Sequence, residues 1–166
     1  MLRSIRRFFC AVLVMVTPAC LAQSLPATAG ETLSGKVVLA DAVCGHTTIL
    51  VAGFSREGGA GTGDWVKTIH ADPAFAKATV YPVAMLAGAP AFIRGMIRSG
   101  MTKGLSAAEQ DRFVVLTEDE KLWRTYFGVT TDKEPCVVLL DSQGKVLWRG
   151  HGTSANLEPQ VRVALH

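Results

Sequence analysis

Residues 47–65 read TTILVAGFSREGGAGTGDW, and this stretch decides the fold. Its first eight residues, 47–54, are almost all apolar or β-branched, which predicts a strand buried on both faces. The four glycines within residues 55–63 predict a loop, and a helix is predicted to start at Trp65. Where a strand runs into a helix N-terminus, free backbone N–H groups are available for binding or chemistry.

The patterns on either side of this stretch predict alternating strands and helices. Further strands are predicted at residues 36–40, 79–86, 113–117, 136–141 and 145–150, and further helices at 89–101, 118–127 and 157–165. This order predicts a mixed α/β fold with a C-terminal hairpin and a closing helix. Because the strand at 47–54 is too apolar to lie at an edge, helices are expected on both faces of the sheet.

The first 22 residues have the three-part pattern of a secretory signal peptide. Three arginines precede an apolar run at 8–16, which is far shorter than the roughly 20 residues of a membrane-spanning helix. Small residues follow, and cleavage after Ala22 fits the small-residue rule. The sequence therefore predicts an exported protein, periplasmic or secreted, with a signal peptide at 1–22, a lead-in segment at 23–34 and a domain at 35–166.

The signal peptide also accounts for the basic charge of the chain. It contains three of the 17 lysines and arginines and no acid, so 14 basic residues face 14 acidic ones afterwards. A near-neutral domain gives no reason to expect a nucleic-acid partner or a membrane-surface partner. Lipid attachment at Cys20 is disfavoured, because Thr17 stands where a lipoprotein signal has a larger aliphatic residue.

The C-terminal third carries a family resemblance. Gly128-Val129, Pro135 and the turn 142–144 resemble the second half of a thioredoxin-like domain, where a Gly-Val pair ends a helix and a cis-proline precedes a strand and a hairpin. Residues 35–54 resemble the first hairpin and core strand of the exported thiol-reductase and peroxiredoxin-like branch. The resemblance implies a thioredoxin-like fold, with a central mixed sheet, helices on both faces and a C-terminal β-hairpin plus helix.

Two shorter segments resemble one group within that superfamily. Residues 53–56 with Asp64-Trp65, and residues 146–150, are similar to the mitochondrial ATP-synthase assembly-factor group and its bacterial relatives. That group lacks the active-site cysteines and is associated with assembling a membrane complex. The resemblance therefore implies a redox-inactive binding or assembly factor of the cell envelope, with a protein partner that belongs to a membrane complex.

The catalytic residues of related enzymes are missing where the strand at 47–54 leads into the predicted helix. A dithiol oxidoreductase needs a C-x-x-C motif at the start of the first helix, and no cysteine lies between Phe54 and Val66. A peroxiredoxin has a cysteine three residues after a threonine, but Trp65 stands three residues after Thr62. The glycines fit neither the dinucleotide-binding nor the P-loop pattern. The histidines show no ligand spacing, so we expect neither a metal nor a cofactor.

Two functional hypotheses remain open at this point. In the first, an inherited binding surface consists of Ser55, Arg56, Glu57, Glu134 and Pro135. Arg56 beside free N–H groups can receive a carboxylate or phosphate, although a surface pair with Glu57 is the alternative. In the second, Cys136 serves a single-cysteine thiol oxidoreductase or a peroxiredoxin-like enzyme. Cys136 can equally be a small buried core residue.

We expect no disulfide between Cys44 and Cys136, the two cysteines left after signal cleavage. Cys44 precedes the strand at 47–54, whereas Cys136 is expected at the other end of that strand. Eight strand residues at about 3.3 Å each separate the two ends by about 25 Å. A disulfide requires Cα atoms within about 7 Å of each other.

Overall fold

A computed structural model describes residues 25–26, 30–36, 43 and 45–165. The predicted signal peptide, most of the strand expected at 36–40, and Cys44 lie outside the described residues. None of the helices within these ranges is long and apolar enough to cross a membrane.

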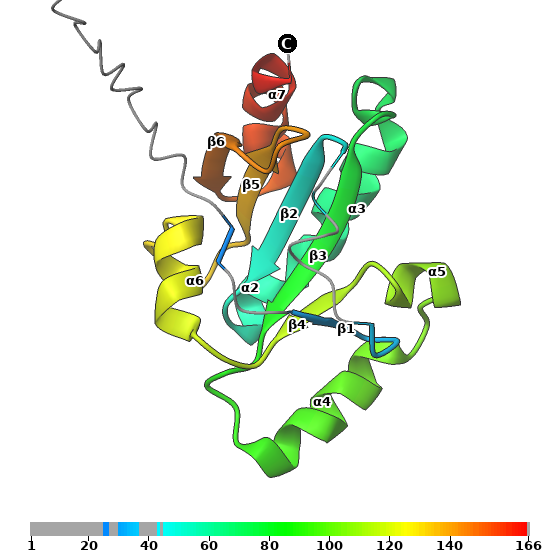
Figure 1. Ribbon diagram of the computed structural model, residues 1–166, viewed down its shortest axis with the longest axis vertical. Helices are drawn as coiled ribbons and strands as arrows, with labels where there is room; N and C mark the ends of the chain where they lie inside the picture. The colour runs from blue at the N-terminus through cyan, green and yellow to red at the C-terminus, as the bar shows by residue number, and fades with distance from the viewer. Residues whose placement is uncertain (1–24, 27–29, 37–42, 44, 166) are drawn as a thin grey trace, which may run out of the picture.

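The described residues form a six-stranded sheet in the order β1-β4-β3-β2-β5-β6 (Figure 1). The strands are β1 (Glu31–Thr32), β2 (Thr48–Gly53), β3 (Thr79–Met85), β4 (Val114–Leu116), β5 (Cys136–Leu140) and β6 (Val146–His151). As its apolar sequence predicts, β2 is central, and all six of its residues are buried. It runs parallel to β3 and antiparallel to β5.

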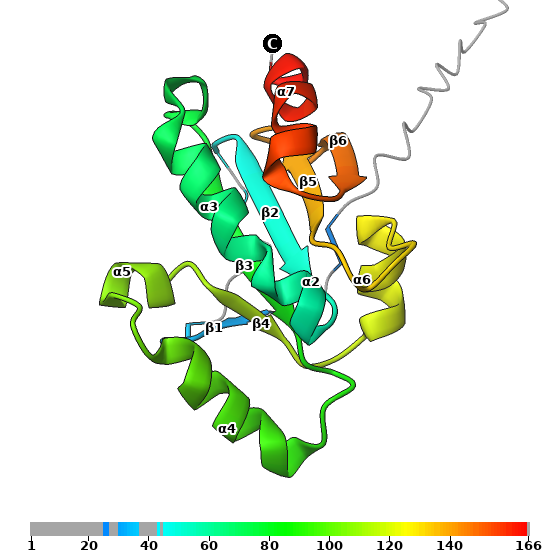
Figure 2. The ribbon, with the colours of Figure 1, turned by 180° about the vertical axis from the view of Figure 1, so that it is seen from behind.

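The helices are α2 (Arg56–Ala60), α3 (Thr62–Ala71), α4 (Ala91–Thr102), α5 (Ala107–Gln110), α6 (Glu120–Phe127) and α7 (Ser154–Ala164), with a 3-10 turn at Pro73–Phe75. On one face of the sheet, Trp65 and Ile69 of α3 and Val161 of α7 form a core cluster (Figure 2). On the other face, Trp123 and Phe127 of α6 pack against the sheet. Helices on both faces, together with the C-terminal hairpin and helix, confirm the predicted fold class.

Three elements differ from the sequence prediction. The strand β1 lies within the segment expected to be a lead-in, and its two residues pair with Val114 and Val115 of β4. The short helix α5 was not predicted, because its four residues carry too little periodicity to detect. The third element, α2, replaces the predicted loop after β2 and belongs to the candidate site.

Proline at position 82 does not interrupt β3. The strand β4 pairs with β3 only from Val83 onward, so Pro82, which has no N–H, takes no part in that ladder. The first half of β3 is therefore paired with β2 alone among the described strands.

Candidate functional site

The glycine-rich stretch that follows β2 is a helix, so the prediction of a loop at residues 55–63 is wrong. Ser55 caps α2, and its Oγ accepts a hydrogen bond from the Gly58 N–H at 3.1 Å. The helix α3 then begins at Thr62, three residues before the predicted start. A serine cap supplies a partner for an N–H that would otherwise lack one, and this outweighs the low helix propensity of glycine.

Two glycines, Gly53 at the end of β2 and Gly58 of α2, allow the backbone to approach other backbone segments closely. A Cβ on Gly58 would lie 2.6 Å from the carbonyl oxygen of Asp132 and 3.0 Å from that of Glu134. A Cβ on Gly53 would lie 2.4 Å from the Cα of Gly59. Both contacts are with backbone atoms, so a side chain at either position would force the segments apart.

A charged network fixes the loop that faces α2. The Arg124 guanidinium of α6 donates to both carboxylate oxygens of Asp132, at 2.6 and 2.8 Å, and to Glu120 at 2.8 Å. The same guanidinium lies 5.3 Å from the centre of the Phe54 ring. Ser55 Oγ donates to the Asp132 carbonyl at 2.6 Å. Bidentate pairing and these backbone contacts hold α2, α6 and the loop in one arrangement.

Acid should weaken this network. The hydrogen bonds from Arg124 lower the pKa of Asp132, so its carboxylate stabilises the fold above the unfolded-state value of about 3.9. That contribution is lost as the pH falls through the lowered folded-state pKa. We therefore expect the urea midpoint of an Asp132→Asn variant to fall less than that of the wild type between about pH 4 and pH 2. The exposed Asp64→Asn variant is the control, and parallel curves for wild type and Asp132→Asn would contradict the expectation.

Cys136 lies at the start of β5, fully buried, between Ala52 of β2 and His151 of β6. Burial raises the pKa of its thiol to about 11, and the negative charge of Asp132 acts in the same direction. The thiol is therefore protonated at neutral pH, and a protonated, buried thiol is a poor nucleophile. The geometry favours the interpretation of Cys136 as a core residue.

The peptide bond before Pro135 is trans, so the expectation of a cis-proline is wrong; the described residues hold no cis peptide bond. The trans isomer is the one that an X-Pro bond prefers by about 0.5–1 kcal/mol. The ring fits against Gly61, where a Cβ would lie 3.0 Å from Pro135 Cγ. The Pro135 carbonyl accepts from the Gly152 N–H at 3.0 Å.

The remaining predicted residues surround this proline. Ser55, Arg56, Glu57 and Glu134 are exposed at the end of the sheet where β2 meets α2, whereas Pro135 is buried. No Arg56–Glu57 pair occurs among the ion pairs of the described residues. Sequence reasoning missed Arg124 and Asp132, although Glu120 and Arg124 have the i, i+4 spacing of a helical ion pair.

A groove of about 550 Å³ leads away from Pro135 between α3 and the start of α7. Gly61 and Thr68 line the α3 side, and Thr153 and Ser154 line the other. The hydroxyls of Thr68 and Ser154 hydrogen-bond at 3.1 Å and join the two walls. The site thus combines an exposed polar helix start with an adjoining groove.

Solved structures share this architecture. A thiol:disulfide interchange protein of the thioredoxin family from Chlorobium tepidum TLS aligns with a TM-score of 0.54 and 18% identity, covering 86% of this chain and 96% of that one. The exposed lipoprotein thioredoxin Etrx1 of Streptococcus pneumoniae strain TIGR4 aligns with a TM-score of 0.55 and 16% identity, covering 82% and 97%. The fold is thioredoxin-like. No family model and no curated protein matches the chain.

A third thioredoxin-like neighbour has a different described role. BsSco, a member of the Sco family of cytochrome c oxidase assembly proteins, aligns with a TM-score of 0.55 and 16% identity, covering 83% of this chain and 91% of that one. At these identities the comparisons establish the thioredoxin-like fold and leave the activity to the residues of the site. At the site, the first helix after the core strand begins Ser55-Arg56-Glu57, without a thiol.

The burial of Cys136 gives a measurable prediction. In a Cys44→Ser variant of the chain without residues 1–22, Cys136 is the remaining cysteine. With a pKa of about 11, we expect its reaction with a disulfide reagent at pH 8 to be at least about 100-fold slower than that of an unfolded control in urea. Equal rates in the folded and unfolded states, followed by absorbance, would show that the thiol is accessible and reactive.

Proposed function

We propose that this protein is an exported binding or assembly factor of the cell envelope, which acts without thiol redox chemistry. The observation that carries the proposal is the chemistry of the junction. The helix start at residues 55–57 presents a hydroxyl and two charged side chains, and the nearby Cys136 is buried and protonated at neutral pH. A surface of this kind can bind a partner, whereas a redox centre would need an accessible thiolate.

The rigidity of the surface supports a binding role. Ser55 is held by Gly58 and Asp132, and Asp132 is held by Arg124. Arg56 and Glu57 therefore project from a fixed backbone, which lowers the entropic cost of binding a partner. The partner that fits is a protein segment that lies in the groove beside Pro135 and pairs its charges with Arg56 and Glu57.

Activity assays test the non-redox part of the proposal. Insulin reduction and peroxide consumption by the exported form should equal the protein-free background. Activity above background that is lost in a Cys136→Ala variant would overturn the proposal in favour of a single-cysteine enzyme. Activity that persists in that variant would indicate contamination, and the purified variant would then serve as the baseline.

Site-specific cross-linking tests the binding part. A photo-reactive residue at Glu57 should cross-link a defined envelope protein in intact cells, and an Arg56→Glu substitution should reduce the yield at least about fivefold, in keeping with an interfacial charge reversal. The matched control carries the photo-reactive residue at Lys145, which is exposed in the turn between β5 and β6. Equal yields of the same product from both positions would contradict a binding surface at α2.

A further inference from the structure

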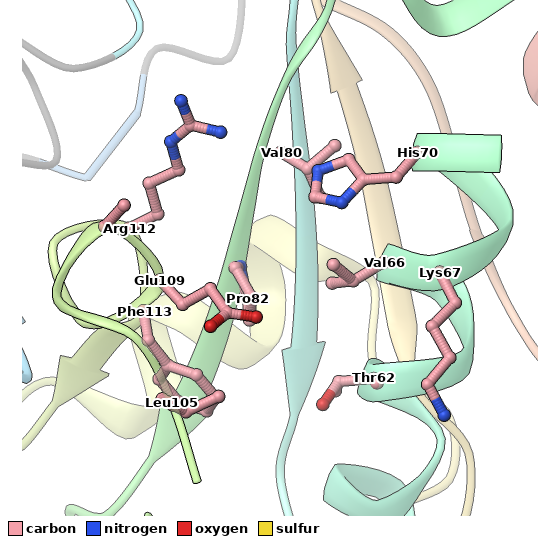
Figure 3. Close-up of a pocket in the computed structure, with 12 residues that line it drawn as sticks. Thr62, Val66, Lys67, His70, Val80, Pro82, Leu105, Glu109, Arg112 and Phe113 are labelled. Carbon is pink, nitrogen blue, oxygen red and sulfur yellow. The ribbon is translucent and has the colours of Figure 1, made fainter. Parts of the chain in front are cut away.

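A second cavity lies on the other side of α3, away from the groove at Pro135. It has a volume of about 310 Å³ and is enclosed by α3, the first half of β3 and the segment around α5 (Figure 3). Apolar side chains dominate its surface: Val66 from α3, Val80 and Pro82 from β3, and Leu105 and Phe113 from the segment around α5. Pockets that bind small ligands start at about 300 Å³ and have mostly apolar linings with a few polar groups.

The cavity exists because of how the chain continues after β3. The next helix, α4, lies at the β1 and β4 side of the sheet (Figure 2), and its Ile97 and Met101 pack against the cluster of Leu33, Leu86 and Val115. It therefore leaves the sheet surface beside α3 uncovered. The short helix α5 closes that space only in part.

Hydrogen bonds and an ion pair hold the α5 side of the cavity in place. Ser106 and Glu109 form a capping box, in which the Glu109 carboxylate accepts from the Ser106 N–H at 2.8 Å and from its Oγ at 2.7 Å. Asp111 pairs with Lys36 at 2.6 Å, and Gln110 donates to the Leu105 carbonyl at 3.0 Å. These bonds fix the wall without a ligand, so the cavity is preformed.

The charges around the cavity favour an anion. Lys67 and Arg112 stand on opposite walls, and their charged ends extend away from the centre of the cavity toward its rim (Figure 3). Lys67 has only an exposed contact with Asp64 at 3.7 Å, and Arg112 forms no ion pair within the part of the chain that the structure describes. Glu109 is the acidic residue that lines the cavity, and one of its carboxylate oxygens already accepts a hydrogen bond from the Ser106 N–H. Two cations thus remain available to a ligand carboxylate.

We propose that this cavity binds a small amphipathic carboxylate, with an apolar body of about two fused rings over Val80 and Pro82 and its anionic group toward Lys67 or Arg112. The size of the ligand body follows from the cavity volume of about 310 Å³. An engineered cavity of about 150 Å³ holds one benzene molecule, so this cavity has room for about two rings. This site does not rest on the proposed function, since α3 separates it from the groove, although Lys67 lines both.

The test uses naphthalene-2-carboxylate and its neutral isostere naphthalene-2-carboxamide as probes. In NMR titrations of the chain without residues 1–22, the carboxylate should shift the Val66, Val80 and Phe113 resonances and bind about tenfold tighter than the carboxamide. Lys67→Gln or Arg112→Gln should reduce this preference by at least about threefold. Equal affinity of the two probes would overturn the anionic assignment and favour an apolar side chain of a partner protein as the occupant.

A substitution that fills the cavity completes the test. Gly63 lies on the α3 face that lines it, and a Cβ there meets no atom within 4 Å. Gly63→Leu should therefore fold normally and weaken carboxylate binding at least about tenfold, because it occupies the apolar volume. Gly100→Leu, on α4 and equally unobstructed, is the control and should bind as the wild type does. No binding by the wild type, or unchanged binding by Gly63→Leu, would overturn the proposal.

Discussion

Replacing Gly58 by alanine should destabilise the protein by about 2–3 kcal/mol, the upper range for an added methyl group in a closely packed site. The new Cβ would lie 2.6 Å from the Asp132 carbonyl oxygen and 3.0 Å from that of Glu134. Neither backbone atom can rotate away as a side chain would. Either α2 or the loop must therefore shift, and the 2.6 Å bond from Ser55 to Asp132 would lengthen or break. Urea denaturation at neutral pH measures the change.

The neighbouring residue supplies a matched control. Gly59 belongs to the same helix, and a Cβ on it meets nothing within 4 Å. Gly59→Ala should leave stability unchanged or raise it by up to about 1 kcal/mol, as the helix propensities of the two residues predict. If the two alanine variants unfold at the same urea concentration, the close approach of α2 to the loop is not a constraint on the fold. A loss of cross-linking from Glu57 in Gly58→Ala alone would connect that approach to partner binding.

The sequence predicted those parts of the fold that local patterns determine. The sequence predicts the buried strand of β2, the turn at residues 142–144 and the end of α6 at Gly128. In the structure Gly144 and Gly128 have positive φ angles of 77° and 67°. Asp141 Oδ1 accepts from the Gln143 and Lys145 N–H groups, at 2.8 and 2.9 Å. Such features depend on residues within a few positions of each other, so the sequence carries them directly.

The site was harder to predict because it depends on contacts between distant segments. Four glycines near Ser55 favoured a loop, yet the chain there forms α2, and one of them, Gly58, lets α2 pack against a loop more than 70 residues away. No sequence motif marks the Ser55 cap of α2 or the pairing of Arg124 with Asp132. Ser55, Arg56, Glu57, Glu134 and Pro135 were selected from the sequence, with Cys136 as the alternative, and they lie where β2 leads into α2 and just before β5. Their role in binding stays a prediction. The contacts that fix them came from the structure.

The proposed function rests on how the thioredoxin-like fold arranges the junction after β2. A buried central strand still leads into a capped helix, and a proline loop still faces that helix. The thiol nearest to this junction, Cys136, lies under the loop within the sheet, where burial raises its pKa to about 11. The Arg124–Asp132 pair and the Gly58 contact hold the loop against α2, so the proposed partner would meet Arg56 and Glu57 on a fixed backbone.

Replacing Trp65 by alanine should cost about 3–5 kcal/mol, the range for deleting a buried tryptophan side chain. Its indole is fully buried between α3 and the sheet, and Nε1 donates to the Gly152 carbonyl at 2.9 Å. This bond joins α3 to the turn before α7, the two segments between which the groove beside Pro135 lies. Urea denaturation at neutral pH, compared with the wild type, gives the change in the free energy of unfolding.

A second variant separates the hydrogen bond from the packing. Trp65→Phe keeps most of the apolar volume but leaves the buried Gly152 carbonyl without its donor, which should cost about 1–3 kcal/mol. Leu122→Ala, at a side chain that is 50% exposed, is the control and should change stability by less than about 0.5 kcal/mol. If Trp65→Phe matched the wild type, the indole N–H would have no role in holding α3 to α7. If it unfolded as early as Trp65→Ala, the hydrogen bond would outweigh the packing of the ring.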